Sequence, residues 1–218
     1  MKVLTEFQEK FLKEISKTSI KDKFFLTGGT ALSAFYLKHR FSDDLDFFTQ
    51  VPRAINKIIL PLEEIVQKLS IKLEISRRFE TFLEGTITSE KGEITRFHFA
   101  EDAPFRLEPT VFNKKYELYI DTLIDISCNK FSALFERHEM KDFVDIYFID
   151  KEVIKFEELY TKTQKKYVGL DDYWLAYALR YINEISNLPK MIKSVTIEEL
   201  REFFNEKIKI LMNRIKSS

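Results

Sequence analysis

Residues 24–48, FFLTGGTALSAFYLKHRFSDDLDFF, contain the features that decide the fold and point to a function. Two of the chain's five glycines, Gly28 and Gly29, stand side by side after a short apolar run. The apolar run predicts a strand, and the glycines predict a turn into a helix that Thr30 caps. One helix later, the letters LDFF predict a neighbouring strand. The stretch therefore predicts a strand–helix–strand unit with a glycine turn.

An acidic pair leads into the second of these strands. Side chains alternate along a strand, so Asp44 and Asp46 are expected on one face while Leu45 and Phe47 face the core. Two carboxylates about 7 Å apart along a strand can hold a hard divalent cation such as Mg²⁺. Asp43 is expected in the preceding turn. Because a glycine turn lets backbone N–H groups approach an anion, the pattern predicts a phosphate site beside a metal.

Each half of this pattern also has a simpler interpretation. A Gly-Gly pair before a helix is by itself more often a turn than a phosphate site, and an isolated Asp-x-Asp is usually a solvated strand end. The combination, one helix apart, favours the functional interpretation. Haloacid-dehalogenase-type phosphatases also use Asp-x-Asp, but they place a threonine at the position that Phe48 occupies here. That class is therefore disfavoured.

The composition excludes other classes of protein. The 218 residues include 35 basic and 35 acidic side chains, so only a local patch would attract nucleic acid or an anionic membrane. The 21 phenylalanines predict a core rich in rings. The single cysteine, Cys128, excludes an internal disulfide. The charged N-terminal segment does not resemble a signal peptide, and no apolar run is long enough to span a bilayer. We therefore expect a cytoplasmic protein with no membrane partner.

The rest of the chain divides into a β-rich part and a helical part. Apolar spacing predicts helices over residues 4–18 and 55–69, the second kinked or split at Pro61. Alternation predicts strands over 71–79, 81–90, 93–100 and 116–121, with a hairpin turn at Lys91-Gly92. Further helices are predicted over 122–150 (two helices), 156–167, 171–186 and 196–216. The fold prediction is thus α/β (α+β): a mixed sheet flanked by helices in residues 1–120, then a helical region in 121–218.

Two stretches resemble one known family. LTGGTALSAFYLKHRFSDDLDFF, residues 26–48, looks like the opening motif of the AbiEii/AbiGii toxin-type nucleotidyltransferases, within the polymerase-β-like nucleotidyltransferase superfamily. DISCNKFSALFERHEMKDFVDIYFI, residues 125–149, resembles the family's lysine-bearing helix and the KDxxD helix after it. The resemblance covers roughly residues 24–150. It implies a nucleotidyltransferase-like fold and a Mg²⁺-dependent transfer of an NMP from an NTP to tRNA or protein.

The resemblance implies roles for residues of the first motif. Gly28, Gly29 and Thr30 would bind the nucleotide triphosphate. Asp44 and Asp46 would bind Mg²⁺ as catalytic carboxylates. This division of labour suits the reaction, because phosphoryl-type transfer is catalysed mainly by positioning and by charge neutralisation.

In the second motif, the resemblance implies that Lys130 neutralises phosphate charge. Asp142 or Asp145 would then complete the catalytic site, with the helical half closing the cleft. The alternative for Lys130 and Asp142 is a salt bridge between two helices, which would stabilise the fold without contacting nucleotide.

The chain departs from the superfamily pattern at the third carboxylate. Polymerase-β-type transferases normally carry it on a later strand, here EITRFHFAED. Alternation places Phe97 and Phe99 on one face and Arg96 and His98 on the other, so His98 occupies the expected position of the acid. A histidine can act as base or metal ligand, although an isolated one between aromatic residues is more often structural. One-metal chemistry, a base from the second motif, and nucleotide binding without catalysis all remain open.

The family resemblance also implies partners. The expected role is the toxin of a toxin–antitoxin or phage-defence pair, with a cognate antitoxin as partner. The basic C-terminal stretch REFFNEKIKILMNRIKSS, with Lys162, Lys165 and Lys166, can bind an RNA backbone, although a solvated helix face explains these charges as well. The alternatives are a non-catalytic nucleotide- or partner-binding protein on a degenerate nucleotidyltransferase fold, and a purely structural α/β protein.

Overall fold

The computed structural model describes residues 2–102 and 105–217 and divides the chain into two compact units. The sheet unit comprises Met1–Tyr36 and Ser42–Leu123, and the helical unit comprises Leu37–Phe41 and Ile124–Ser218. The sequence suggested a single boundary at residues 120/121. In the structure the division lies three residues later, and a short piece of the first motif belongs to the helical unit.

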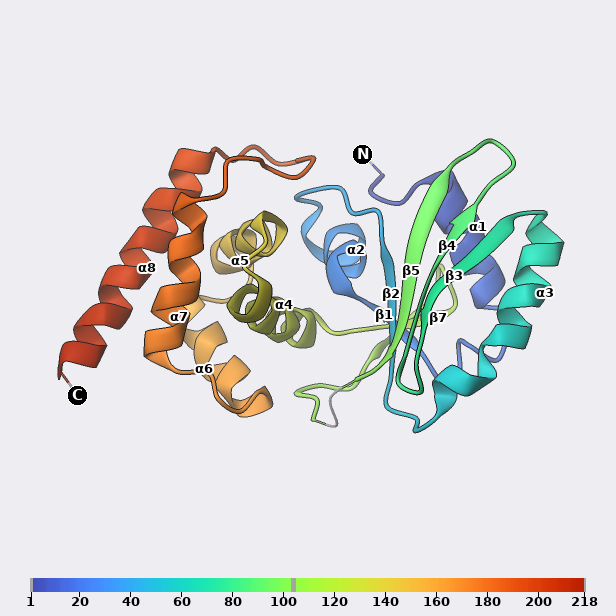
Figure 1. Ribbon diagram of the computed structural model, residues 1–218, viewed down its shortest axis with the longest axis horizontal. Helices are drawn as coiled ribbons and strands as arrows, with labels where there is room; N and C mark the ends of the chain where they lie inside the picture. The colour runs from blue at the N-terminus through green and yellow to red at the C-terminus, as the bar shows by residue number, and fades with distance from the viewer. Residues whose placement is uncertain (1, 103–104, 218) are drawn as a thin grey trace. The chain divides into compact units, whose positions relative to one another are not determined.

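The described residues form one seven-stranded mixed sheet in the sheet unit (Figure 1). In spatial order its strands are β3 (Lys72–Arg78), β4 (Phe82–Thr88), β5 (Ile94–Glu101), β2 (Leu45–Thr49), β1 (Phe25–Thr27), β7 (Leu118–Ile120) and β6 (Val111–Asn113). β1 pairs with β7 and β2 pairs with β5 in parallel, and the other neighbours are antiparallel. The mixed α/β fold is confirmed, whereas β6 was not predicted.

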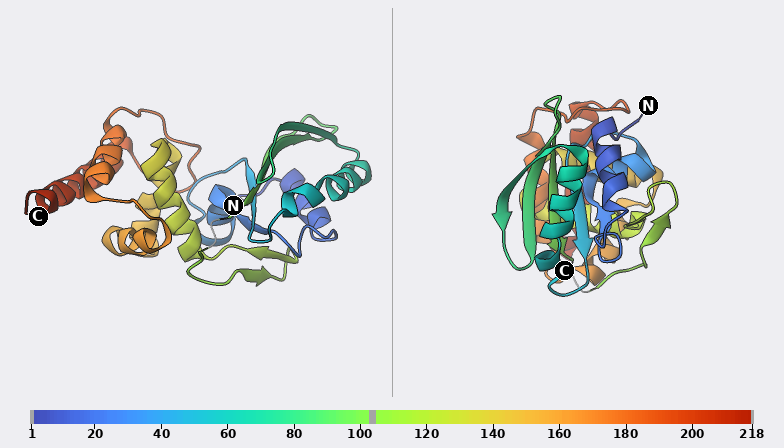
Figure 2. Two further views of the ribbon diagram at one scale, coloured as in Figure 1. Left: turned by 60° about the horizontal axis from the view of Figure 1, so that its bottom comes forward. Right: turned by 90° about the vertical axis from the view of Figure 1, so that its right-hand side faces the viewer.

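Two helices cover one face of the sheet, α1 (Glu6–Ile15) and α3 (Ile59–Leu69) (Figures 1 and 2). Thr5 caps the N-terminus of α1 and forms a reciprocal capping box with Gln8. The core beneath them is rich in rings, as the composition predicts. Phe97 and Phe99 of β5 are fully buried and contact each other, and the rings of Phe11, Phe24 and Phe47 pack against them.

The glycine helix begins three residues earlier than predicted. α2 (Gly28–Ala31) continues directly into a π-helical segment, η1 (Leu32–Leu37), on the sheet face opposite α1 and α3 (Figure 1). The residue in the capping position is Thr27, so the prediction that Thr30 caps this helix was wrong. Thr30 lies inside the first turn, where its hydroxyl donates to the main-chain oxygen of Asp44.

The helix predicted over 55–69 is split, but the split lies at Ile58 and not at Pro61. A 3₁₀ turn, η2 (Ala54–Lys57), precedes α3, which starts at Ile59. Pro61 therefore lies in the first turn of α3, where a helix tolerates its missing N–H group. The Lys91-Gly92 hairpin is also present, and Gly92 adopts the positive φ of 81° that such turns favour.

The helical unit contains α4 (Leu123–Arg137), α5 (Met140–Glu152), α6 (Phe156–Lys166), α7 (Asp172–Leu179), η3 (Arg180–Asn183) and α8 (Ile197–Ser217). These helices were predicted, although the one expected over 171–186 ends in the 3₁₀ turn η3. α8 packs against α7 (Figure 1). Residues 142–150 of α5 are all buried, charged ones included. Within the described ranges, every helix is too short or too polar to cross a bilayer.

Candidate active site

Asp46 lies at the centre of the candidate site. It sits near the start of β2, opposite Thr27 of β1 and beside His98 of β5. The Asp46 Oδ1 atom is 2.7 Å from Nδ1 of His98. Laterally paired residues point to the same face of a sheet, so His98 faces the same side as Asp46, as the alternation of β5 predicts. Phe97 and Phe99 are buried on the other face.

Gly28 lies directly against the Asp46 carboxylate. Its φ of 72° is in the left-handed region that favours glycine, and a Cβ atom at this position would overlap the carboxylate group of Asp46. The glycine turn and the acidic strand of the first motif are therefore in contact. This close approach accounts for the placement of a glycine at position 28.

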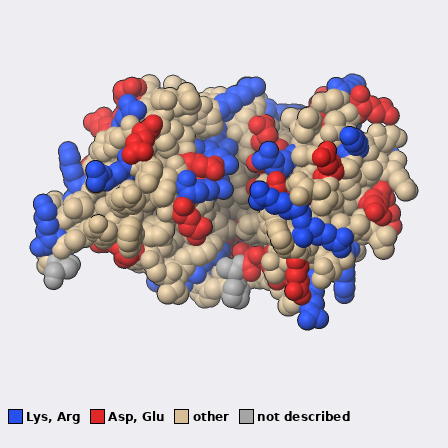
Figure 3. All heavy atoms as spheres, in the orientation of Figure 1, with Lys and Arg blue, Asp and Glu red and all other residues tan. Residues whose placement is uncertain are grey.

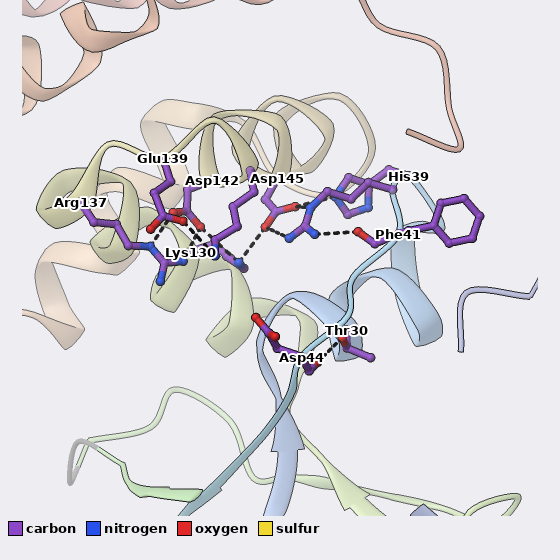
Figure 4. Close-up of polar contacts among 11 residues, drawn as sticks. Thr30, His39, Phe41, Asp44, Lys130, Arg137, Glu139, Asp142 and Asp145 are labelled. Carbon is purple, nitrogen blue, oxygen red and sulfur yellow. Dashed lines mark hydrogen bonds and ion pairs between the residues drawn. The ribbon is translucent and has the colours of Figure 1, made fainter. Parts of the chain in front are cut away.

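Asp44 precedes β2 rather than lying in it, because the strand starts at Leu45. Strand alternation therefore does not determine the direction of its side chain. The segment is held instead through its main chain: Thr30 donates to the Asp44 oxygen (Figure 4), and the Gln8 side chain donates to the Asp43 oxygen at 3.0 Å. Asp44 is half-buried and Asp43 is exposed, the latter as expected for a turn residue.

The environment of His98 favours its protonated form. Burial alone lowers the pKa of His98, but the hydrogen bond and negative charge of Asp46, together with the charge of Asp44, outweigh burial and raise it. The ring of Phe82 stacks on the imidazole, with centroids 5.9 Å apart. His98 is thus oriented by one carboxylate and one aromatic ring.

The two carboxylates near the glycine turn fit a divalent cation that takes its other ligands from a substrate and from water. Mg²⁺ is typically bound by one or two carboxylates together with phosphate oxygens and water, and Asp44 and Asp46 can supply the carboxylates. Residues 2–102 and 105–217 contain no cluster of three or more acidic, His or Cys side chains arranged as a complete metal site. His98 would orient Asp46 through its hydrogen bond, as outer-sphere partners of metal ligands do.

The residues implicated in the second motif meet within the helical unit (Figure 4). Lys130 of α4 lies between two carboxylates of α5, with its Nζ atom 3.2 Å from Asp142 Oδ1 and 2.8 Å from Asp145 Oδ2. Its side chain is only 8% exposed. Arg137 contacts Asp142 as well, through two N–H groups at 2.7 and 2.9 Å. The helix–helix ion pair that was the alternative interpretation of Lys130 is present.

Two partners of this cluster were not identified from the sequence. Arg40 binds Asp145 with two parallel hydrogen bonds of 2.7 and 2.8 Å, and His39 Nε2 lies 2.6 Å from the same carboxylate. His39 and Arg40 follow the helix of the first motif, where basic side chains usually remain in solvent and favour the helix C-terminus; both are instead buried. No local pattern signals this pairing, because more than one hundred residues separate the partners.

Asp145 is consequently an ionised carboxylate with both oxygens engaged. Burial raises the pKa of Asp145, but the charges of Lys130 and Arg40 and the hydrogen bonds from Arg40 and His39 hold it well below its usual range. Burial lowers the pKa of His39, and its contact with Asp145 offsets this only in part. A role for Asp145 as base or metal ligand would require it to release some of these partners.

Comparison with known proteins gives the family. A family model described as "Nucleotidyl transferase AbiEii toxin, Type IV TA system" matches residues 10–214. The uncharacterized protein aq_aa25 of Aquifex aeolicus (strain VF5) is 30% identical over 213 residues, which cover 96% of this chain and 98% of that protein.

Solved structures share the fold. A putative nucleotidyltransferase from H. pylori superimposes with a TM-score of 0.63 at 16% identity, covering 98% of both chains. JHP933 from Helicobacter pylori gives 0.59 at 16% identity, over 95% of this chain and 90% of that one. MenT4, the nucleotidyltransferase toxin Rv2826c from Mycobacterium tuberculosis H37Rv, gives 0.56 at 14% identity, over 94% and 82%. Together with the family match, these findings identify the chain as a nucleotidyltransferase of the AbiEii toxin family, which belongs to type IV toxin–antitoxin systems.

Proposed function

We propose that this chain is a Mg²⁺-dependent toxin that moves an NMP from an NTP to a macromolecular acceptor. The observation that carries the proposal is the contact between Gly28 and the Asp46 carboxylate, with Asp44 two residues earlier. This arrangement would give phosphate a close approach to the backbone, and Asp44 and Asp46 would offer two hard oxygen ligands to the cation.

The chain's own residues would divide the work as follows. Gly28 and Gly29 let the triphosphate approach the backbone, and Thr30 fixes the residue that carries the Asp44 carboxylate. Asp44 and Asp46 would hold Mg²⁺, which when bound neutralises phosphate charge. The oxygen of the acceptor hydroxyl then bonds to the α-phosphorus, its proton passes to water, and the bond to pyrophosphate breaks, while positioning supplies most of the catalysis.

Labelled-nucleotide transfer tests the proposal. The purified protein is incubated with each α-labelled NTP, Mg²⁺ and bulk tRNA, and label on the RNA and on protein is measured. Asp46→Asn should reduce transfer by about 100-fold or more, as expected when charge stabilisation at a reacting centre is removed. Asp43→Asn is the matched control, because Asp43 is an exposed neighbouring acid and its change should leave transfer intact. Equal loss in both variants would contradict the assignment.

The alternative is a protein that binds nucleotide or a partner without turnover. The observation that favours it is His98, which stands beside Asp46 at the expected place of a third carboxylate. Calorimetry with each NTP, with and without Mg²⁺, separates the two when it is combined with the label-transfer assay. Mg²⁺-dependent binding without label transfer would establish a nucleotide-binding protein without turnover, and absence of NTP binding would overturn the transferase and leave only binding of a partner.

tRNA is the first acceptor to test, and protein the second. Lys165 is exposed, but Lys166 is buried and its Nζ atom contacts Asp125 at 2.7 Å. Neither of the two interpretations of Lys166, an RNA contact or a solvated helix face, describes this buried ion pair. On α8, Lys209 and Arg214 are exposed. Basic and acidic side chains alternate over the face seen in Figure 3, so an RNA contact would rest on such local groups rather than on a broad basic surface.

The proposed biological role is that of a toxin acting in the cytoplasm, opposed by a cognate antitoxin, in a toxin–antitoxin or phage-defence pair. Expression of the chain in a bacterial host tests this role. Growth should stop with the natural sequence and continue with Asp46→Asn at the same protein level.

A further inference from the structure

A row of polar side chains crosses the sheet at the glycine turn. The β1–β2 register places Thr27 opposite Asp46, and the β2–β5 register places His98 beside Asp46. Beyond β1, Asp121 follows β7 directly, and its N–H group donates to the Leu26 oxygen at 2.8 Å, which extends the parallel β1–β7 pairing by one residue. In spatial order the row is Asp121, Thr27, Asp46 and His98.

Asp121 holds the end of β1 through its side chain. Its Oδ2 atom accepts a 2.7 Å hydrogen bond from the Thr27 hydroxyl, and both residues are fully buried. Its Oδ1 atom accepts a hydrogen bond from Arg106, whose guanidinium also lies 4.5 Å from the centre of the Phe25 ring. A buried carboxylate needs such partners to offset its desolvation, so this geometry is strongly restrained.

Asp121 also holds the other end of the glycine helix. The Tyr36 hydroxyl, at the end of η1, donates to the main-chain oxygen of Asp121 at 2.7 Å. Burial and then the charge of Asp121 raise the pKa of Tyr36, which keeps this hydroxyl a donor. Asp121 therefore contacts the residue before Gly28 and the eighth residue after it.

These contacts bear on Asp46 through Gly28. Thr27 precedes Gly28 directly, and a single added carbon at Gly28 would overlap the Asp46 carboxylate. A small movement of the end of β1 would therefore displace that carboxylate. We propose that Asp121 is a positioning residue of the transferase site, which acts through Thr27 and Tyr36 to fix Gly28 against Asp46 and so to orient Asp46 toward a divalent cation. This inference rests on the proposed metal-binding role of Asp46.

A matched set of threonine variants tests it. Thr27→Val removes the hydroxyl that donates a hydrogen bond to Asp121 and nearly keeps the volume of the side chain. Thr27→Ser keeps the hydroxyl. Thr49→Val is the control: Thr49 is equally buried, ends β2 away from Asp46, and donates its hydroxyl to the Lys23 oxygen at 2.6 Å. Asp121→Asn tests the carboxylate itself.

The probe is Mn²⁺, added without nucleotide and followed by electron paramagnetic resonance. Thr27→Val and Asp121→Asn should each weaken Mn²⁺ binding by about tenfold, as changes to outer-sphere partners of metal ligands do. Thr27→Ser should restore the wild-type affinity. Thr49→Val should lower the melting temperature about as much as Thr27→Val while leaving Mn²⁺ affinity unchanged. Hydrogen exchange should become faster at residues 28–31 in Thr27→Val and not in Thr49→Val.

The failures of the two proposals are distinguishable. If the wild-type protein binds Mn²⁺ and the Thr27→Val and Asp121→Asn proteins bind it equally well, the positioning role is wrong and the metal site stands. If Thr49→Val weakens Mn²⁺ binding as much as Thr27→Val, the effect is one of general stability and the positioning role is again wrong. If the wild-type protein binds no Mn²⁺, the proposed metal site is wrong and the positioning role falls with it.

Discussion

At the scale of single residues, the site depends on the space that Gly28 leaves for the Asp46 carboxylate. Glycine is required there for two separate reasons, a φ of 72° and the overlap that any Cβ would create. Gly92 shares only the first reason, since its φ is 81° and an added Cβ meets no described atom within 4 Å. Comparing the two positions separates backbone strain from displacement of the carboxylate.

We predict that Gly28→Ala abolishes nucleotide transfer while Gly92→Ala does not. A left-handed φ costs a non-glycine residue on the order of 1–3 kcal/mol, so both variants should be destabilised by comparable strain. Only Gly28→Ala also moves Asp46. The measurements are the free energy of unfolding in urea and the rate of label transfer. Full transfer by Gly28→Ala would contradict the contact between the turn and Asp46.

Some features of the site could be predicted from the sequence, and others could not because they depend on contacts between distant segments. Gly28, Asp46 and the orientation of His98 follow from local rules, namely turn chemistry and strand alternation. The contact of Thr30 did not follow from these rules, because the hydroxyl that was expected to cap its own helix binds the main chain of Asp44 instead. The sequence also did not indicate Asp121. Its contacts with Thr27 and Tyr36 join segments that are distant in the sequence, and they form only when β7 pairs with β1.

At the scale of elements, α4 and α5 were predicted as helices, but the burial of their charged side chains was not. The side chains of Asp125, Lys130, Asp142 and Asp145 are all at most 8% exposed. Amphipathic patterns assign charged residues to the solvent side, and the exception arises where oppositely charged partners meet in the core. The pairing of Lys166 with Asp125 is a second instance, which links α6 to α4.

We predict that Lys130→Ala destabilises the protein by about 3–5 kcal/mol, because it leaves two buried carboxylates with less compensation. Lys141→Ala is the control on α5: Lys141 pairs with Glu139 in a partly exposed contact, and its loss should change stability by about 1 kcal/mol or less. Stability is measured by urea unfolding, and NTP affinity by calorimetry below the unfolding range.

The same pair of measurements decides what Lys130 does. Lower stability with unchanged NTP affinity would make Lys130 a structural cation of the helical unit. A folded Lys130→Ala protein with weakened NTP binding would support the role in neutralising phosphate charge that the family resemblance implies. An unchanged unfolding free energy would contradict the burial of Lys130 and the ion pairs that Figure 4 draws around it.

At the scale of the whole molecule, the chain passes between the two units more often than its sequence suggests. The first motif leaves the sheet unit at Leu37, passes five residues through the helical unit, and returns at Ser42. Those five residues are held there by the pairing of His39 and Arg40 with Asp145, and by main-chain bonds such as Phe41 N–H to the Lys190 oxygen at 2.8 Å. A boundary read along the sequence cannot detect such an insertion, since it depends on contacts between distant segments.

This insertion predicts how stability depends on pH. The pKa of His39 is lowered, chiefly by burial, and the pKa of Asp145 is held low by its cationic partners. In both cases the unfolded chain binds protons more readily than the folded protein, so stability falls as pH falls. The His39 contribution is lost first, below its ordinary pKa of about 6.5, and the Asp145 contribution follows below about 4. The pKa of His98 is raised, so this residue makes the fold more stable as pH falls. A variant of His39 therefore isolates the contribution of His39 to the pH dependence of stability.

We therefore predict that His39→Gln flattens the fall in unfolding free energy between pH 7 and pH 5. The substituted amide can still donate to Asp145 but takes up no proton when the chain unfolds, which removes the linkage at this position. His138→Gln is the control, because His138 lies in the same unit, stacked on the half-buried Tyr181 rather than paired with a buried acid. Urea unfolding at half-unit pH intervals measures the slope for each protein. If the unfolding free energy of His39→Gln falls with pH as steeply as that of the wild type, His39 is not held neutral in the folded protein. The pairing of a neutral His39 with Asp145 would then not explain how Leu37–Phe41 is held in the helical unit.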